Sequence, residues 1–194
     1  GLNYHLNRVI GDNETGFRGT NDLPYRVEAW QFLLAGGGLY NNLDYSFVAG
    51  HEDGTFVYPA KQPGGGNPAF RRQLRVLGDF LRQFDLVRMK PLAGVRLQAL
   101  AGFDLRALAE PGRAYAFYLG PADVSKKPAN ATSSGRPIRL TLDLPAGTYE
   151  SEWLNPVTGE KQRCEKHHHT SGSLTLDTPD FADDIALRLV RTGR

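Results

Sequence analysis

The sequence has little of several features that would restrict its function class at once. It contains one cysteine, Cys164, so an intrachain disulfide is impossible and cysteine usage indicates no redox compartment. It has no run of about 18 apolar residues, so we expect no transmembrane helix and no membrane partner. The formal net charge is only +2, which gives no argument for a nucleic-acid partner. Phosphate-binding glycine loops, nucleophile elbows and zinc-protease motifs are also missing, so we expect no cofactor.

The opening residues, GLNYHLNRVIG, include neither an initiator methionine nor a signal-peptide pattern. Because they lead almost directly into a strand, we expect the chain to be a piece of a longer protein. The opening therefore indicates no compartment.

The first half of the sequence alternates between strand and helix patterns. We expect strands over 7–11 and 39–50, helices over 23–35 and 69–87, and a long loop over 51–68. Alternation of this kind is typical of parallel strands joined by right-handed crossovers. Two such units cannot bury a parallel sheet by themselves, so further strands are needed.

Both predicted helices have clear start signals. Asn21 or Asp22 can cap the first helix, and Asn67 followed by Pro68 opens the second. Trp30 lies on the apolar stripe of the first helix and is expected in its core. On the second helix, the arginines lie away from the apolar stripe and predict a solvated exterior rather than a nucleic-acid face. These arginines are Arg71, Arg72, Arg75 and Arg82.

From about residue 95 the pattern changes to short alternating runs separated by turns such as EPGR, LPAG and NPVTGE. Six to eight short strands of this kind predict an antiparallel β-sandwich. We therefore expect two domains, 1–93 and 94–194. Alternation places Tyr149, Ser151 and Trp153 on one face, which predicts sandwich core; an exposed binding platform is the alternative.

Three consecutive histidines, His167 to His169, raise the possibility of a metal site. On a strand only His167 and His169 share a face, and two ligands make a weak site, so we expect no metal. Alternation puts Cys164 on the opposite face, where we expect it to be a small buried residue.

Polar side chains gather where the two predicted strands of the first half end. They are Asp12, Asn13 and Glu14 after the first strand, Asn42, Asp44 and Tyr45 near the end of the second, and His51, Glu52 and Asp53 in the next loop. In parallel βα architectures the residues that follow the strands face one rim, where functional groups lie. Simple turns and a solvated loop explain the same residues equally well.

Three segments, DNETGF, AGGGLYNNLDYSF and GHEDGT, resemble the last two βα units of glycoside-hydrolase-like (β/α)8 barrels. The group that the sequence most resembles is the apiosidase-like (DUF4038-type) family. Its members commonly carry a C-terminal β-sandwich labelled as a collagen-binding domain of a collagenase, and WLNPVTGE is similar to that module. The resemblance implies a partial (β/α)8 barrel, or TIM barrel, followed by an antiparallel β-sandwich, and hence an α/β plus all-β fold.

The resemblance also implies roles for the polar residues. Glu14 matches the nucleophile at the end of strand seven in retaining barrel glycosidases. The acid partner of such barrels lies at the end of strand four, which this sequence does not contain. Asp44, Glu52 and Asp53 could substitute for that acid but do not match the family pattern. Together with Asp12, Asn13 and Asn42, they are candidates for hydrogen bonds to sugar hydroxyls, and Tyr45, Phe47 and His51 can shape a sugar subsite. A complete barrel takes about 250 residues, so we expect the chain to be inactive alone.

Two other functions stay open at this point. The β-sandwich can be a non-catalytic module that binds carbohydrate or a matrix protein such as collagen, or a structural domain that stabilises the barrel. The expected partners are a carbohydrate and either the missing N-terminal barrel portion or a second copy of the chain, because incomplete sheets recruit partners. The resemblance alone suggests a secreted or periplasmic protein.

Overall fold

The computed structural model describes residues 2, 4–15, 17–59, 64–93, 95–98, 102–125 and 137–193. The elements of the first half are η1 (Tyr4–Leu6), β1 (Gly11–Thr15), α1 (Asp22–Leu34), β2 (Leu39–Asn42), α2 (Pro68–Leu81) and η2 (Leu86–Arg88). The strands of the second half are β3 (Lys90–Pro91), β4 (Arg96–Gln98), β5 (Phe103–Glu110), β6 (Ala114–Pro121), β7 (Arg139–Asp143), β8 (Gly147–Leu154), β9 (Lys161–His169), β10 (Ser173–Asp177) and β11 (Ile185–Thr192).

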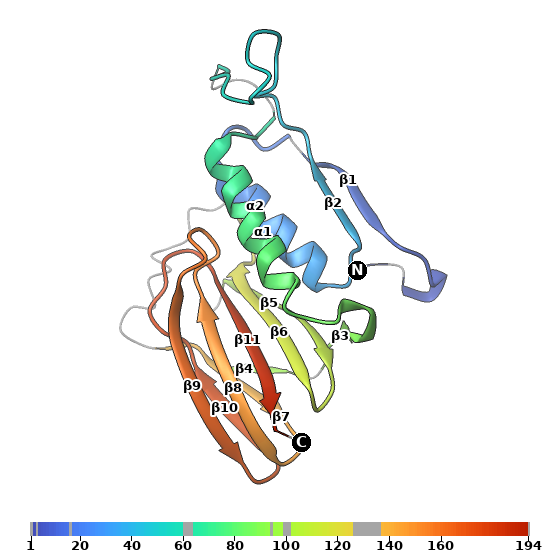
Figure 1. The fold of residues 1–194 in the computed structure, drawn as a ribbon, viewed down its shortest axis with the longest axis vertical. Coiled ribbons are helices and arrows are strands. Elements are labelled where there is room, and N and C mark those ends of the chain that lie inside the picture. The colour runs from blue at the N-terminus through green and yellow to red at the C-terminus, as the bar shows by residue number, and fades with distance from the viewer. Residues whose placement is uncertain are drawn as a thin grey trace.

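The elements stack in layers (Figure 1). β1 and β2 form a parallel two-stranded sheet, and α1 and α2 lie between this sheet and the β-sandwich. The sandwich consists of a six-stranded sheet, ordered β3-β5-β6-β11-β8-β9, and a three-stranded sheet, ordered β10-β7-β4. Every pairing within these two sheets is antiparallel. Among the described residues, strands thus predominate, with two α-helices.

The predicted antiparallel β-sandwich is present, and its core lies between the two sheets. Tyr149, Ser151 and Trp153 point inward and are 0%, 1% and 3% exposed, as their alternation predicts. Phe117 and Leu187 from the neighbouring strands β6 and β11 join them in the same cluster. The burial of Trp153 removes it as an exposed platform for a ligand.

A second core joins the helices to the outer face of the six-stranded sheet. Trp30 of α1 stacks on Tyr118 of β6, with ring centroids 5.1 Å apart, and lies equally close to Phe80 of α2. Leu154 and Ala186 complete the sheet side of this cluster. Burial of a large apolar side chain stabilises a fold by about 1.5–3 kcal/mol, so this contact between the two halves is substantial. The division into domains at residue 93 remains a prediction.

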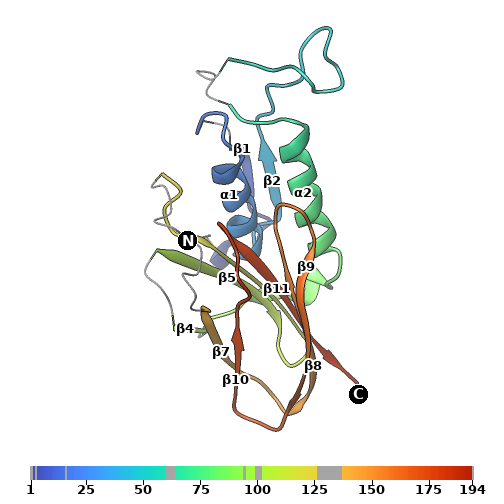
Figure 2. The same cartoon turned by 90° about the vertical axis from the view of Figure 1, so that its left-hand side faces the viewer.

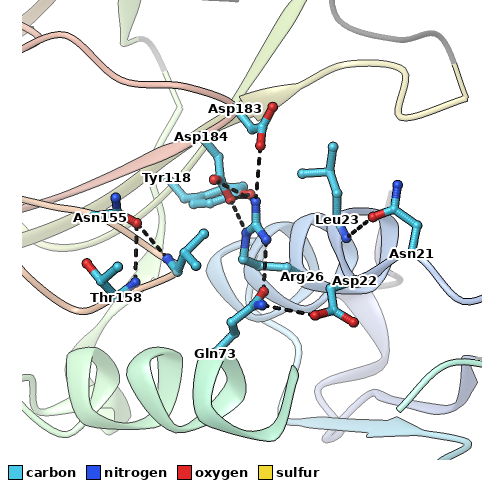
Figure 3. A network of polar contacts seen from close by, with 11 residues as sticks. Asn21, Asp22, Leu23, Arg26, Gln73, Tyr118, Asn155, Thr158, Asp183 and Asp184 are labelled. Atoms are coloured by element: carbon cyan, nitrogen blue, oxygen red, sulfur yellow. Dashed lines mark hydrogen bonds and ion pairs between the residues drawn. The ribbon is translucent and has the colours of Figure 1, made fainter. Parts of the chain in front are cut away.

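A buried polar network lies beside this second core (Figure 3). Arg26 of α1 donates from Nε and Nη2 to the two carboxylate oxygens of Asp184, at 2.9 and 3.1 Å. Tyr118 donates to the same carboxylate at 2.7 Å, and Arg26 Nη1 donates to Gln73 of α2 at 2.8 Å. Asp184 directly precedes β11, so a single guanidinium connects both helices to the sandwich (Figure 3).

The NPVTGE turn between β8 and β9 is also part of this junction. Its Asn155 side chain accepts hydrogen bonds from the backbone N–H groups of Val157 and Thr158 (Figure 3). Gly159 has a φ of +78°, and a Cβ there would lie 3.3 Å from Val76 of α2. A glycine therefore lets the turn lie against the helix.

Three predicted boundaries were wrong. The first strand begins at Gly11 rather than Asn7, because its extent is set by pairing with Leu39–Asn42 of β2 and not by the apolar pair before it. The second strand ends at Asn42 rather than Gly50. Helix α2 ends at Leu81, after which Phe84 folds back to pack against Phe80 with ring centroids 5.2 Å apart.

Candidate functional site

The carboxyl ends of β1 and β2 lie side by side, as the strand-helix alternation predicts. The strands are parallel, with Gly11 opposite Leu39 and Asp12 opposite Tyr40. Beyond these pairs, the Leu43 N–H donates to the Thr15 carbonyl at 2.8 Å. The loops that follow the two strands therefore start at a common edge.

Asp12, Asn13 and Glu14 lie within β1 and not after it, which corrects the predicted loop position. The Glu14 side chain is exposed, and among the described residues it has no hydrogen bond or ion pair. Asn13 is also exposed, and its carbonyl accepts a hydrogen bond from the Asn41 side chain at 3.2 Å. Glu14 is thus the carboxylate of β1 that is open to a ligand.

Asp12 has a different environment, because it faces the helix layer. It accepts a hydrogen bond from Thr15 Oγ1 at 3.0 Å and lies opposite Tyr40, whose hydroxyl donates to the Tyr25 carbonyl of α1. Burial raises the pKa of the Tyr40 hydroxyl, and the nearby carboxylates of Glu28 and Asp12 raise it further. Burial likewise raises the pKa of Glu28.

Asn42 pairs with Thr15 at the end of the same sheet. Its side-chain oxygen is buried, and no hydrogen-bond partner for it occurs among the described residues. Because Asn42 and Tyr40 are two residues apart on one strand, both side chains are on the helix side.

Asp44 is held in place by an ion pair. Its carboxylate accepts hydrogen bonds from Arg71 Nη1 of α2 at 2.7 Å and from the Ser46 N–H at 3.0 Å. The side chain is 18% exposed. A carboxylate already paired in this way has few oxygen lone pairs left for a ligand.

His51, Glu52 and Asp53 occupy an exposed turn at the top of the molecule in Figure 1. Glu52 accepts from the Gly50 N–H at 2.9 Å, and Asp53 accepts from Thr55 Oγ1 at 2.7 Å. Hydrogen bonds to the carboxylates lower the pKa of both Glu52 and Asp53, so both are ionised at neutral pH. The turn is charged and solvent-facing, with contacts mainly to itself.

Tyr45 and the glycine run of PGGGNP pack against each other. A Cβ on Gly64 would overlap the Tyr45 ring, and one on Gly65 would overlap the ring of Tyr25. Gly66 has a φ of +113° and abuts Asp44. The run is therefore explained by close approach to these side chains, and it ends at the Asn67 cap of α2.

The sequence analysis misjudged Arg71 and did not consider Arg26. Arg71 was placed on a solvated helix exterior, yet it binds Asp44, Ser46 and Gly54. Its position one turn after the Asn67 cap places it at the start of α2, but its contact with the Gly54 carbonyl could not be predicted from the sequence.

The histidine run lies on the edge strand β9, and each ring contacts β8 or a nearby turn. His167 lies 2.8 Å from Ser151 Oγ, His168 lies 3.2 Å from Thr148 Oγ1, and His169 Nε2 lies 3.1 Å from the Leu144 carbonyl. No group of three metal-binding side chains occurs among the described residues. The prediction that Cys164 is buried was wrong: it is exposed, because β9 is the last strand of its sheet.

Comparison with solved structures shows that glycoside hydrolases share this fold. One glycoside hydrolase chain matches with a TM-score of 0.60 and 13% identity over 95% of this chain and 43% of its own length. A glycoside hydrolase family 5 structure from Bacteroides vulgatus matches with a TM-score of 0.56 and 14% identity over 88% of this chain and 36% of its own.

This chain therefore spans less than half the length of either neighbour. No family model and no curated protein matches the sequence. At these identities the likeness concerns the fold. It covers both the βα half and the sandwich, since 95% of the chain aligns with one neighbour. None of the helices in the described part of the chain is both long and apolar enough to span a bilayer.

Proposed function

We propose that this chain is the C-terminal part of a glycoside hydrolase-like protein that acts on carbohydrate, with Glu14 as its nucleophile. One observation carries the proposal. Glu14 is an exposed carboxylate next to the last residue of β1, with no hydrogen bond or ion pair among the described residues, in a fold that solved glycoside hydrolases share. In barrel enzymes, catalytic groups lie at the carboxyl ends of such strands.

The proposed chemistry needs a second carboxyl group. Glu14 attacks the anomeric carbon while a carboxylic acid protonates the leaving oxygen; water then releases the sugar. Asp44 is a poor candidate for that acid, because Arg71 already pairs with it. Glu52 and Asp53 are ionised and solvent-facing. The family resemblance implies an acid at the end of strand four, so we place it in the missing barrel portion.

The same proposal makes the chain catalytically incomplete by itself. β1 and β2 form a sheet of only two strands in the described part of the chain, whereas a (β/α)8 barrel has eight. The remaining strands would come from a preceding barrel portion. We further propose that the complete protein is related to the apiosidase-like family that the sequence resembles.

For the β-sandwich, the observations favour a structural role over a ligand-binding one. Trp153 is 3% exposed, and the described aromatic side chains of β5 to β11 are buried or half-buried. The sandwich is also tied to both helices through Arg26. We propose that it stabilises the barrel; the collagen-binding label has no residue-level support in these contacts.

The test compares the product of the complete gene with its Glu14→Gln variant on aryl glycosides and plant polysaccharides. We expect hydrolysis by the wild type and a loss of roughly 1,000-fold or more in kcat for the variant, because a neutral amide cannot act as the nucleophile. The 194-residue chain alone is expected to show no turnover. Turnover by the isolated chain that disappears in Glu14→Gln would overturn the prediction that the chain is catalytically incomplete. Undiminished hydrolysis by the Glu14→Gln variant of the complete gene product would overturn the proposed role of Glu14 as nucleophile.

A further inference from the structure

Polar contacts on the first two turns of α2 connect this helix both to the junction with the β-sandwich and to the loop after β2. The side-chain oxygen of Gln73 accepts a hydrogen bond from Arg26 Nη1 at 2.8 Å. Its side-chain nitrogen donates to the Asp22 carboxylate of α1 at 3.1 Å (Figure 3). Gln73 is 7% exposed, so both ends of its buried amide are satisfied by protein groups.

A second residue at the start of α2 binds the same carboxylate. The Asn67 cap donates from Nδ2 to one oxygen of Asp22 at 2.6 Å, and Gln73 binds the other oxygen. Phe70 also packs here, on Tyr25 of α1, in a tilted contact with ring centroids 5.9 Å apart. The apolar contact holds the start of α2 on α1, and the two hydrogen bonds fix its rotation, because they are directional.

The same part of α2 anchors the loop over 43–58. Arg71 lies in sequence between the two residues that bind Asp22. Its guanidinium donates to the Asp44 carboxylate at 2.7 Å and to the Gly54 carbonyl at 2.7 Å. Asp44 belongs to the first arm of the loop and Gly54 to the second, so one side chain joins both arms to the helix. A rotation of the start of α2 would therefore move or release the loop.

We propose that Gln73 is a positioning residue that fixes the start of α2 to the junction with the β-sandwich. Arg71 then transmits this position to the loop over 43–58. A carboxamide suits the place because its oxygen accepts from a guanidinium and its nitrogen donates to a carboxylate; an ionised glutamate can only accept, and leucine can do neither. The inference rests on these contacts alone and stands whether or not the chain is part of a glycoside hydrolase.

The test is amide hydrogen exchange of the 194-residue chain, measured by mass spectrometry on peptides that cover the loop over 43–58 and strand β11. Within the loop, the Ser46 N–H donates to Asp44 at 3.0 Å and the Phe56 N–H donates to the Ser46 carbonyl at 3.2 Å, so these amides report loop opening. Strand β11 is paired on both sides within the six-stranded sheet, so its amides report global unfolding.

Gln73→Leu should lower the protection factors of the loop amides about tenfold, as expected for the loss of a hydrogen bond to a charged group. Gln73→Glu keeps the acceptor for Arg26 and loses the donor to Asp22; it should also lower loop protection, and it decides the test where Gln73→Leu fails to fold. Thr178→Val is the matched control, because Thr178 is 3% exposed and accepts a hydrogen bond from the Ile138 N–H within the sandwich. It should lower protection in β11 and leave the loop unchanged, as would any residue that only stabilises the fold.

Double variants test the route from the sandwich to the loop. Arg71→Met should lower loop protection by itself, and Gln73→Leu should have little further effect in that background. Asp184→Asn weakens the sandwich end of the network and should lower loop protection while Gln73 is present, but not in the Gln73→Leu background. Unchanged loop protection in both Gln73 variants, or an equal effect of Gln73→Leu with and without Arg71, would overturn the positioning role. Unchanged loop protection in Asp184→Asn would overturn the link to the sandwich.

Discussion

At the scale of single residues, the guanidinium of Arg26 lies where a charge is stable only because its partners surround it. The side chain is 5% exposed, and its main partner, Asp184, is 2% exposed. Burial and the Asp184 carboxylate together raise the pKa of the Tyr118 hydroxyl, which keeps Tyr118 as a donor to Asp184 at neutral pH. Removal of Asp184 leaves the buried guanidinium with the more exposed Asp183, 3.7 Å from Nη2, as its remaining charged partner, and removal of Arg26 leaves the Asp184 carboxylate buried without a cation.

Asp184→Ala should therefore lower the free energy of unfolding by about 3–5 kcal/mol. The matched control is Asp177→Ala, because Asp177 also forms an ion pair with an arginine, Arg139, but on the surface, where the two side chains are 39% and 50% exposed. The Asp177→Ala control should lower the free energy of unfolding by less than about 1 kcal/mol. Urea unfolding followed by circular dichroism measures both, and equal losses would contradict a special role for the buried pair.

The sequence did not predict this pair. Arg26 was one of three charged residues of its helix, with Asp22 and Glu28, and Asp184 is 158 residues away along the chain. Glu14, in contrast, could be selected from its position after an apolar pair and from the family resemblance. Its surroundings could not be predicted, because they depend on where β1 pairs with β2.

At the scale of elements, local signals in the sequence predicted the starts of both helices. Asn21 caps α1, and Asn67 caps α2 with Pro68 in its first turn. Such signals act between residues two or three apart, so they can be recognised without the fold. The end of α2 and the extent of β1 depend on contacts with other elements, and there the predictions were wrong.

The two caps should differ in strength. Asn67 accepts from the Phe70 N–H at 2.8 Å and also donates to Asp22 of α1 at 2.6 Å. Asn21 is exposed, and its side chain accepts only from the Leu23 N–H among the described residues. We expect Asn67→Ala to lower the free energy of unfolding by about 2 kcal/mol and Asn21→Ala to lower it by about 0.5–1 kcal/mol. Thermal and urea unfolding of the two variants test this order, and a larger loss for Asn21→Ala would contradict it.

At the scale of the whole molecule, the parallel sheet is the least covered layer. In the described part of the chain neither β1 nor β2 has a partner on its outer edge. Apolar side chains nearby are also exposed, among them Val9 at 83%, Leu39 at 53% and Val87 at 96%. Unpaired strand edges beside exposed apolar side chains are typical of surfaces that another chain or segment covers.

We therefore expect the isolated chain to self-associate at micromolar concentrations, unless a preceding barrel portion is supplied. Light scattering after size-exclusion chromatography measures the mass as a function of concentration. Val87→Asp should shift the equilibrium toward monomer, because a charge resists burial, while Val57→Asp, on the distant loop, should not. A monodisperse wild-type monomer would contradict the expectation.

The layered stacking shown in Figure 2 has a practical consequence for truncation. Expression of residues 94–194 alone would expose Tyr118, Leu154 and Ala186, which the helices bury, and would leave Asp184 without the Arg26 guanidinium. Such a truncated protein would present to water an apolar sheet face that now lies beneath two helices. Cloning strategies for the β-sandwich should therefore begin no later than the Asn21 cap of α1, even though the composition of the sequence changes some seventy residues further on.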